Sequence, residues 1–263
     1  MKEIAAYKFM PAPNATSRFS DRVDNYVRYR PGYPPAAIDT LKVECSLMPT
    51  HEIADIASGT GIWTRMLLEN GNNIFGVEPN AEMRAAGERL LTAFPKFTSI
   101  DGSAEATTLS DKCVDFVTAA QAAHWFDREK SRREFARVLK PDGWLVLLWN
   151  ERATDSTEFL RDYEKLLLTF GTDYTEIRHE RTTSAIDEFF DPAPFQERTF
   201  AMRQGFDYPG VEGRLLSSSY APGPDHPQHA PMLRELRHIF GRHSIAGRVA
   251  FDYTTRLYFG RLT

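Results

Sequence analysis

Cysteine is scarce in this sequence, and Cys45 and Cys113 are the only two among 263 residues. Two separate thiols form neither a disulfide framework nor a cysteine-based zinc site, so we expect a cytoplasmic protein without a metal centre. The sequence has no run of about 18 apolar residues, so we expect no membrane-spanning helix and no membrane partner. The first stretch of the chain lacks a long apolar core, and we therefore expect no secretory signal peptide.

A large excess of positive charge is also missing. The net charge of −4 argues against general nucleic-acid binding, so we expect no nucleic-acid partner. The chain is 42% hydrophobic and 12% aromatic, which is enough to bury the core of one large domain, or of one domain with an insert, and to line a pocket. We expect this single domain, residues 1–263, to be a monomer or a homodimer.

Short β-rich runs alternate with helical patterns in the first 150 residues. This alternation predicts βαβ units and a parallel sheet, and apolar runs without polar alternation are typical of strands covered on both faces. Pro34 and Pro35 suit the first turn of a helix. The predicted strands are the runs at 51–57, 73–78, 97–100, 114–120 and 144–149.

The pattern changes after Trp149. Residues 157–171 and 230–243 predict amphipathic helices, and 195–204 predict a strand. The stretch 151–245 is too long for a simple connection, so we expect a helical cap that contains one sheet strand. Residues 246–263 predict the last sheet strand, with a bulge near Thr254.

A glycine-containing loop follows the first predicted strand. Gly59-Thr60-Gly61 is typical of a turn that holds a nucleotide-like ligand against backbone amides. The dinucleotide fingerprint G-x-G-x-x-G would need a third glycine where Thr64 stands, and Trp63 would crowd the helix–strand contact. No Gly-Lys-Ser/Thr follows, which also disfavours a phosphate loop.

An acid ends the second predicted strand. Glu78 comes seventeen positions after Gly61, and the carboxyl ends of adjacent parallel strands meet at one edge of a sheet. A carboxylate there can accept hydrogen bonds from both hydroxyls of a ribose. On these residues alone, the ligand is either NAD or an adenosyl cofactor.

The following segments separate these two ligands. "GSAE" at 102–105 comes after the third strand, and "LKPDGWLVLLW" at 139–149 leads into the fifth. Together with Asp55, the glycine loop and Glu78, this order resembles the class I S-adenosylmethionine-dependent methyltransferases. "YRPGYP" at 29–34, "EPNAEM" at 78–83 and "AHWFD" at 123–127 are similar to the small-molecule branch that includes trans-aconitate methyltransferase-like proteins. The resemblance covers roughly residues 18–152.

The resemblance implies a doubly wound, mostly parallel, seven-stranded α/β sheet of the Rossmann-like methyltransferase type, with S-adenosyl-L-methionine as cofactor and 18–150 as the cofactor-binding core. It implies that Arg30 offers a counter-charge to the cofactor's carboxylate and that Asp55 holds loop amides or a water. The cofactor-binding candidates are Tyr26, Arg30, Asp55, Ala57, Ser58, Gly59, Thr60, Gly61, Glu78, Pro79, Met83, Ser103, Ala104, Glu105 and Gln121. The substrate-binding candidates are Tyr33, Trp125, Trp149 and Tyr220.

His124 is the catalytic candidate, because an imidazole titrates near neutral pH and can act as a general base. Two residues depart from the family pattern. Ala57 stands where the loop D-x-G-x-G-x-G has its first glycine, and Ser103 stands where the family often has Asp. The alanine is small enough for cofactor binding to survive, and the serine accepts a hydrogen bond from adenine more weakly.

The leading hypothesis is a methyltransferase that acts on a small molecule, at oxygen. A nucleic-acid or protein methyltransferase is the alternative, supported only by a basic C-terminal stretch and opposed by the absence of an N-P-P-Y-type tetrapeptide. A cofactor-binding protein without transfer activity is a further alternative, and an NAD-dependent oxidoreductase is disfavoured by the loop. The basic stretch contains Arg234, Arg237, Arg242, Arg248, Arg256 and Arg261.

Overall fold

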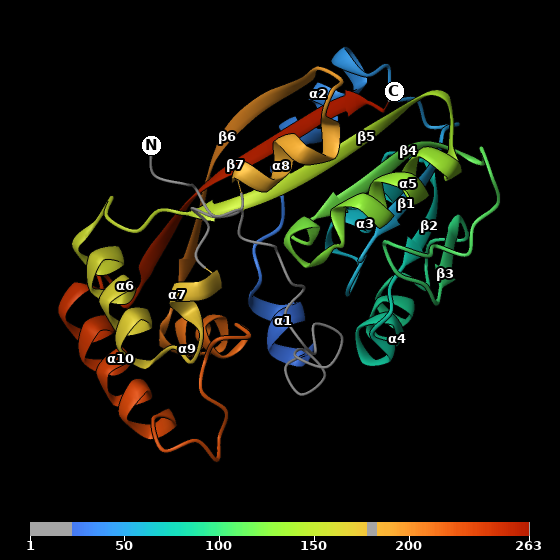
Figure 1. Cartoon of the computed structure of the whole chain (residues 1–263). Coiled ribbons are helices and arrows are strands. Elements are labelled where there is room, and N and C mark those ends of the chain that lie inside the picture. Colours follow the sequence, from blue (N-terminus) through green and yellow to red (C-terminus); the bar gives the residue numbers. More distant parts are fainter. Residues whose placement is uncertain (1–22, 178–182, 263) are drawn as a thin grey trace, which may run out of the picture.

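The computed structural model describes residues 23–177 and 183–262 (Figure 1). Residues 18–22 of the predicted core lie outside the described residues. The described chain forms a seven-stranded sheet with the strand order β3-β2-β1-β4-β5-β7-β6. The strands are β1 (Glu52–Ile56), β2 (Asn73–Val77), β3 (Phe97–Ile100), β4 (Val114–Ala120), β5 (Leu139–Arg152), β6 (Phe195–Phe206) and β7 (Val249–Arg261).

The sheet is parallel from β3 to β5, and β7 runs antiparallel to both β5 and β6. The predicted mostly parallel, seven-stranded α/β sheet is therefore confirmed. The strand order reverses between β1 and β4, and ligands of open α/β sheets bind beyond the carboxyl ends of the strands at such a point.

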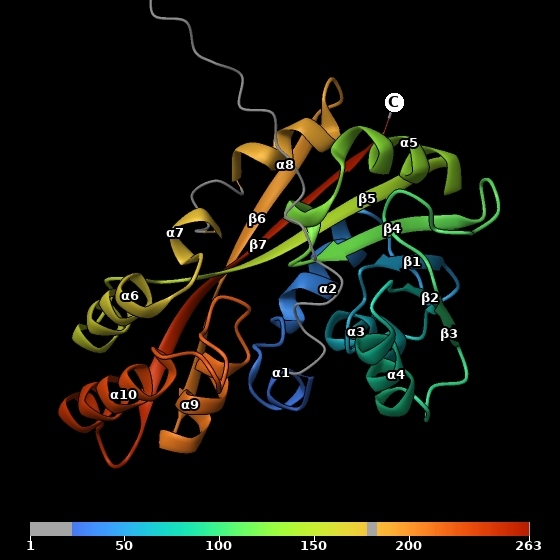
Figure 2. The ribbon, with the colours of Figure 1, turned by 60° about the horizontal axis from the view of Figure 1, so that its bottom comes forward.

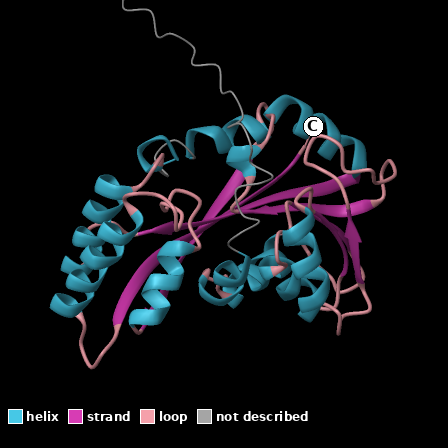
Figure 3. Ribbon diagram, turned by 90° about the horizontal axis from the view of Figure 1, so that it is seen from below, coloured by secondary structure: helices cyan, strands magenta, loops and turns pink. Residues whose placement is uncertain are grey.

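Helices cover both faces of the parallel part of the sheet (Figure 3). One face packs against α2 and α3, and the opposite face packs against α5 and α8. Local signals start several helices: Asn80 caps α4, Asp127 caps α5 and Thr157 caps α6, each by accepting a backbone N–H. The helices of this half are α2 (Pro35–Glu44), α3 (Ile62–Glu69), α4 (Ala81–Leu90), the 3-10 turn η1 (Ala123–Trp125), α5 (Arg128–Val138) and α8 (Thr183–Phe190).

The long strands β5, β6 and β7 extend beyond the parallel part of the sheet (Figures 1 and 2). A separate hydrophobic core forms between this extension and the helices packed on it. Those helices are α6 (Glu158–Phe170), α7 (Tyr174–Ile177), α9 (Tyr208–Leu216) and α10 (His229–His243). The N-terminal α1 (Val23–Tyr29) lies between the two halves and contacts both α9 and α4 (Figure 2).

Several expectations are corrected by these elements. The bulge near Thr254 is wrong, because Thr254 pairs in unbroken register with Glu151 and with Ala201. The alternation of buried residues continues across Thr254, from Val249 to Leu257, so the strand needs no extra residue there. The fifth strand is longer than predicted, because it pairs with β7 as far as Arg152.

Part of the stretch 151–245 does not pack with the cap helices. Helix α8 lies on α5, and its Phe189 and Phe190 are fully buried in the core beneath the sheet. These two aromatics therefore belong to the core of the parallel half of the sheet and not to the cap. Helices α1 and α9 were not anticipated. No helix within the described ranges is long and apolar enough to cross a membrane.

Candidate functional site

Three adjoining cavities lie beyond the carboxyl ends of the strands, and Tyr26 and Gln121 line all of them. We name them the loop cavity (about 480 Å³), the arginine cavity (about 770 Å³) and the Glu78 cavity (about 880 Å³), each volume including its open mouth. Tyr26 comes from α1, and Gln121 follows the last residue of β4. The two residues therefore stand where the three spaces meet.

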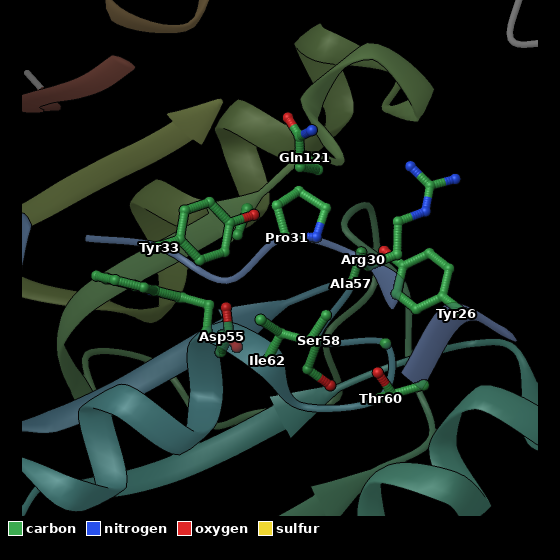
Figure 4. A pocket seen from close by; sticks show the side chains of 13 residues that line it. Tyr26, Arg30, Pro31, Tyr33, Asp55, Ala57, Ser58, Thr60, Ile62 and Gln121 are labelled. Carbon is green, nitrogen blue, oxygen red and sulfur yellow. The ribbon is translucent and has the colours of Figure 1, made fainter. Parts of the chain in front are cut away.

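The loop cavity is formed by the turn between β1 and α3 (Figure 4). Ala57, Ser58, Gly59 and Thr60, four of the cofactor-binding candidates, line it. The backbone winds tightly there, with φ of 53° at Ala57 and 58° at Gly59. This left-handed conformation suits glycine, so Ala57 holds it at some cost in backbone strain.

Gly61 has a different role from the rest of the loop. It lines none of the three cavities and forms the N-cap of α3 with φ of 88°. A Cβ atom at Gly61 would lie 2.6 Å from Cδ1 of the buried Leu91. Gly61 therefore allows the loop to pack closely on the end of α4. It does not face the cavity in which we place the cofactor.

Three buried polar atoms at the loop cavity lack a hydrogen-bond partner among the described residues. They are Oγ1 of Thr60, Nε1 of Trp63 and Nε of Arg30. Buried polar groups in folded proteins nearly always have a partner. Their position at one cavity indicates a place built for a polar ligand.

Asp55 lies beneath the loop and is almost fully buried. Its carboxylate accepts hydrogen bonds from Oγ1 of Thr64 at 2.5 Å and from Oγ1 of Thr118 at 2.9 Å. Burial raises the pKa of Asp55 to about 7, although the two hydroxyls oppose the shift. We expected Asp55 to hold loop amides or a water, but in the structure its two oxygens accept from threonine hydroxyls.

Glu78 lines the Glu78 cavity and is 7% exposed. Its Oε2 accepts from the N–H of Gly59 at 2.9 Å, and its Oε1 accepts from the N–H of Asn80 at 2.8 Å. Burial raises the pKa of Glu78, and the two backbone amides moderate the shift. Each carboxylate oxygen keeps further acceptor capacity, so Glu78 can hold the loop and bind ligand hydroxyls together.

The Glu78 cavity gathers most of the remaining cofactor-binding candidates. Pro79, Met83, Ser103, Ala104 and Glu105 all line it. The carboxylate of Glu105 accepts from the N–H of Asp127 and from Oγ of Ser131, so this side chain anchors the start of α5. Oγ of Ser103 accepts weakly from the N–H of Glu105, at 3.3 Å.

The arginine cavity brings together His124, Trp125, Trp149 and Tyr220, which lie far apart in the sequence. The ring centroid of His124 lies 4.4 Å from that of Trp125 and 5.0 Å from that of Trp149. Tyr33, the remaining substrate-binding candidate, lies elsewhere. It lines the loop cavity and packs edge-on against Trp63, with ring centroids 5.5 Å apart.

Three arginines line this cavity, and sequence reasoning identified only Arg30. Arg152 is paired with the buried Glu164, which also accepts from the hydroxyl of Tyr174. Arg214 is 6% exposed. A signal for its burial existed, because Val211, Arg214 and Leu215 share one face of α9 at helical spacing.

Arg30 and Arg214 have only neutral hydrogen-bond partners among the described residues. Arg30 donates to the carbonyl of Ser217 at 2.8 Å, and its guanidinium lies over the ring of Tyr26. Arg214 donates to the hydroxyls of Tyr253 at 3.3 Å and Ser218 at 3.2 Å. Burial lowers the pKa of Arg30, and the nearby charge of Arg214 lowers it further.

None of the six arginines of the basic C-terminal stretch lines these cavities. Arg256 is paired with Glu151 and Glu197, and Arg261 is paired with Asp142. These two arginines are therefore neutralised by neighbouring acids. No cluster of metal-binding side chains occurs in the described part of the chain.

Comparison with known proteins places this geometry in context. A family model described as "Methyltransferase domain" matches residues 54–147. An uncharacterized methyltransferase of Schizosaccharomyces pombe is 33% identical over 183 residues, which are 64% of this chain and 72% of that protein. An uncharacterized methyltransferase of Mycobacterium tuberculosis is 40% identical over 134 residues, or 51% of this chain. That match spans about half the length of the mycobacterial relative, 52%.

Solved structures share the fold at low sequence identity. A structure named "Putative Type II Methyltransferase", from Anaeromyxobacter dehalogenans, has a TM-score of 0.65 and 21% identity, covering 89% of this chain and 98% of that one. A SAM-dependent methyltransferase from Geobacter sulfurreducens, in complex with S-adenosyl-L-homocysteine, has a TM-score of 0.50 and 14% identity, covering 91% and 97%. At such identities the likeness concerns the fold alone.

Proposed function

This chain belongs to the S-adenosylmethionine-dependent methyltransferases, and from this premise we propose that it methylates a small-molecule acceptor, at oxygen, in the arginine cavity. The observation that carries the proposal is the meeting of three cavities at Tyr26 and Gln121. Two of them are lined by the cofactor-binding candidates except Gly61, and the third is lined by the substrate-binding candidates except Tyr33. The preference for oxygen rests on the resemblance to trans-aconitate methyltransferase-like proteins.

The residues at the first two cavities fit the cofactor's chemistry. In this proposal Glu78 accepts from the ribose hydroxyls, and Met83, Ser103 and Ala104 surround the adenine in the Glu78 cavity. The loop cavity takes the methionine end, whose carboxylate meets the guanidinium of Arg30. The unpartnered Oγ1 of Thr60 supports this assignment, because a polar ligand would satisfy it.

When bound, S-adenosylmethionine supplies a methyl group on a positively charged sulfur, and the departing neutral thioether needs no proton. The remaining task of the protein is to position the acceptor and exclude water. Orientation of this kind can contribute roughly 7–11 kcal/mol to a reaction. The side chain of Gln121 is fixed in position beside the three cavities, because its amide forms two hydrogen bonds with the backbone of Asn150.

His124 lies at the aromatic wall of the arginine cavity. An acceptor hydroxyl must lose its proton when it is methylated, whereas a carboxylate has none to lose. We propose that His124 accepts that proton from a hydroxyl acceptor. In this role its ring must reach the acceptor from between Trp125 and Trp149.

Calorimetric titration and a transfer assay test the function. We expect S-adenosylmethionine and S-adenosylhomocysteine to bind and NAD not to bind. Incubation with methyl-labelled cofactor and a small-molecule extract should then yield a labelled product. Cofactor binding without any labelled product would favour a cofactor-binding protein without transfer activity. Preferential binding of NAD would contradict the proposal.

The role of His124 is tested on the acceptor found in that assay. His124→Gln should lower turnover about 10²-fold or more, because general bases typically contribute 10²–10⁴. The loss should shrink as the pH rises and the acceptor ionises without help. His51→Gln is the control, because His51 lies outside all three cavities. Full turnover in His124→Gln would remove the base.

A further inference from the structure

The charges in the arginine cavity are unbalanced. Of its three arginines, only Arg152 has a carboxylate partner, Glu164. Arg30 and Arg214 donate to carbonyl and hydroxyl oxygens, and no ion pair joins either of them to an acid among the described residues. Buried charges are normally paired, because burial of an isolated ion is costly. Two uncompensated guanidiniums at one cavity therefore indicate an anionic ligand.

Arg30 and Arg214 differ in position. Arg30 lines both the loop cavity and the arginine cavity, so it can serve the cofactor's carboxylate. Arg214 lines the arginine cavity and neither of the other two. A cofactor carboxylate at the loop therefore leaves Arg214 without a carboxylate partner, and an anionic acceptor would supply one.

The walls of the cavity add a second constraint. Trp125, Trp149 and His124 form an aromatic cluster on one side, and Tyr174 and Tyr220 pack edge-on with ring centroids 4.9 Å apart on another. Aromatic side chains bind planar rings through offset-stacked and edge-to-face contacts. The cavity thus combines a cationic end with flat apolar walls.

We propose that the acceptor is an aromatic carboxylic acid, whose carboxylate is held by Arg214 and whose ring packs among Trp125, Trp149 and His124. The carboxylate is a handle, distinct from the oxygen that is methylated. Arg214 donates to it from a fixed position, because Tyr253 and Ser218 orient the guanidinium and helix α9 carries it. This inference rests on the proposed function and names its substrate class.

Direct binding tests the inference without turnover. The protein is first saturated with S-adenosylhomocysteine, and a failure at this step counts against the proposed function. Calorimetry then compares 3-hydroxybenzoate with 3-hydroxybenzamide, a neutral molecule of the same shape. We expect the acid to bind at least tenfold more tightly. Equal affinity, or no binding of the acid to the cofactor-saturated protein, would overturn the inference.

Variants then assign the handle. Arg214→Met should weaken binding of 3-hydroxybenzoate at least tenfold and leave binding of the benzamide unchanged, whereas Arg214→Lys should lose less because it keeps the charge. Arg65→Gln is the matched control, because Arg65 is an exposed arginine paired with Glu69. If Arg214→Met fails to fold, Arg214→Lys and the acid–amide comparison still decide the matter. Undiminished acid binding in folded Arg214→Met would refute the handle.

Two further ligands set the class. Phenyl phosphate presents another oxyanion on a ring, and succinate presents carboxylates without a ring. We expect both to bind less tightly than 3-hydroxybenzoate. Tighter binding of phenyl phosphate would refute the carboxylate and indicate that Arg214 binds a phosphate of the acceptor. Tighter binding of succinate would refute the aromatic part of the proposal.

Discussion

The two sides of the site are built in different ways. The loop and Glu78 cavities consist largely of backbone and short side chains that follow β1, β2 and β3 directly. The arginine cavity consists of long side chains from α1, η1, β5, α9 and β7, which converge from distant parts of the chain. A cavity of the first kind depends on local turns, and one of the second kind depends on how the two halves of the molecule pack.

The buried charges of the two sides are also opposite. Asp55 and Glu78 lie under the cofactor side, and burial raises the pKa of both. Arg214 lies on the acceptor side, and Arg30, whose pKa is lowered by burial, lines both the loop cavity and the arginine cavity. The first side is suited to hydroxyls and cations, and the second to an anion.

The sharpest way to break this comparison is to remove the carboxylate at the end of β2. Glu78→Ala should weaken binding of S-adenosylhomocysteine by about 2–4 kcal/mol, or roughly 30- to 1000-fold, through the loss of two charge-assisted hydrogen bonds. Part of this loss comes from the backbone of Gly59 and Asn80, because their N–H groups lose the hydrogen bonds that they donate to Glu78. Calorimetry measures the affinity.

Glu69→Ala is the control for this variant, because Glu69 is an exposed acid in the same half of the molecule. Unchanged affinity in Glu78→Ala would end the ribose assignment. If Glu78→Ala lost affinity for 3-hydroxybenzoate by the same factor as for S-adenosylhomocysteine, the cofactor side and the acceptor side would not bind their ligands independently.

A smaller effect concerns the titration of Asp55. Its folded-state pKa of about 7 lies above the ordinary value of 3.8, so the folded protein binds the proton more tightly. The resulting stabilisation is complete below about pH 4 and is lost as the pH rises through about 7. We expect the free energy of unfolding to fall by about 2–3 kcal/mol between pH 5 and pH 8 from this group.

Asp55→Asn should remove this part of the pH dependence, because an amide does not ionise. Urea unfolding at pH 5, 6, 7 and 8 measures the difference between the variant and the original protein. Asp39→Asn, in an exposed carboxylate on α2, is the control and should keep the original profile. Parallel profiles of Asp55→Asn and the original protein would show that Asp55 is not the titrating group.

The smallest effect sharpens the claim that the cofactor side is set by its backbone. Ala57→Gly relieves a φ of 53° but also makes the unfolded chain more flexible, so stability should change by less than about 1 kcal/mol. Ala246→Gly is a matched control, because Ala246 has φ of 49° on an exposed turn. Both variants should bind S-adenosylhomocysteine within about threefold of the original protein. A tenfold gain in Ala57→Gly alone would show that the methyl group of Ala57 obstructs the cofactor.

The predictability of the fold follows the same division. The strands β3 and β4 have the bounds that the sequence predicted, because apolar runs there are bordered by polar turns. Helix α9 was missed, because its sequence "YPGVEGRLL" contains two glycines and a proline and looks like a loop. Its Gly213 is required by packing, since a Cβ atom there would lie 2.1 Å from Cε2 of Tyr29 on α1.

The candidate residues divide in the same way. Glu78 and the loop from Ala57 to Thr60 could be identified from their order along the chain, and they lie together in the structure. Arg152 and Arg214 were missed. Nothing in the sequence separates Arg152 from a solvated surface residue, and the spacing of Arg214 with Val211 and Leu215 indicates burial only once α9 is known to be a helix. Tyr33 was assigned to the acceptor side, but its packing on Trp63 holds it at the loop.

The sequence itself determined the succession of strands along the chain, the turn after β1 and the acid after β2. Strand, turn and helix signals act over a few neighbouring residues, so they can be recognised without the tertiary structure. The tertiary structure alone decided which arginines are buried without a carboxylate, because that outcome depends on contacts between residues such as Arg30 and Ser217, 187 positions apart. Local signals define the cofactor side, and long-range packing defines the acceptor side.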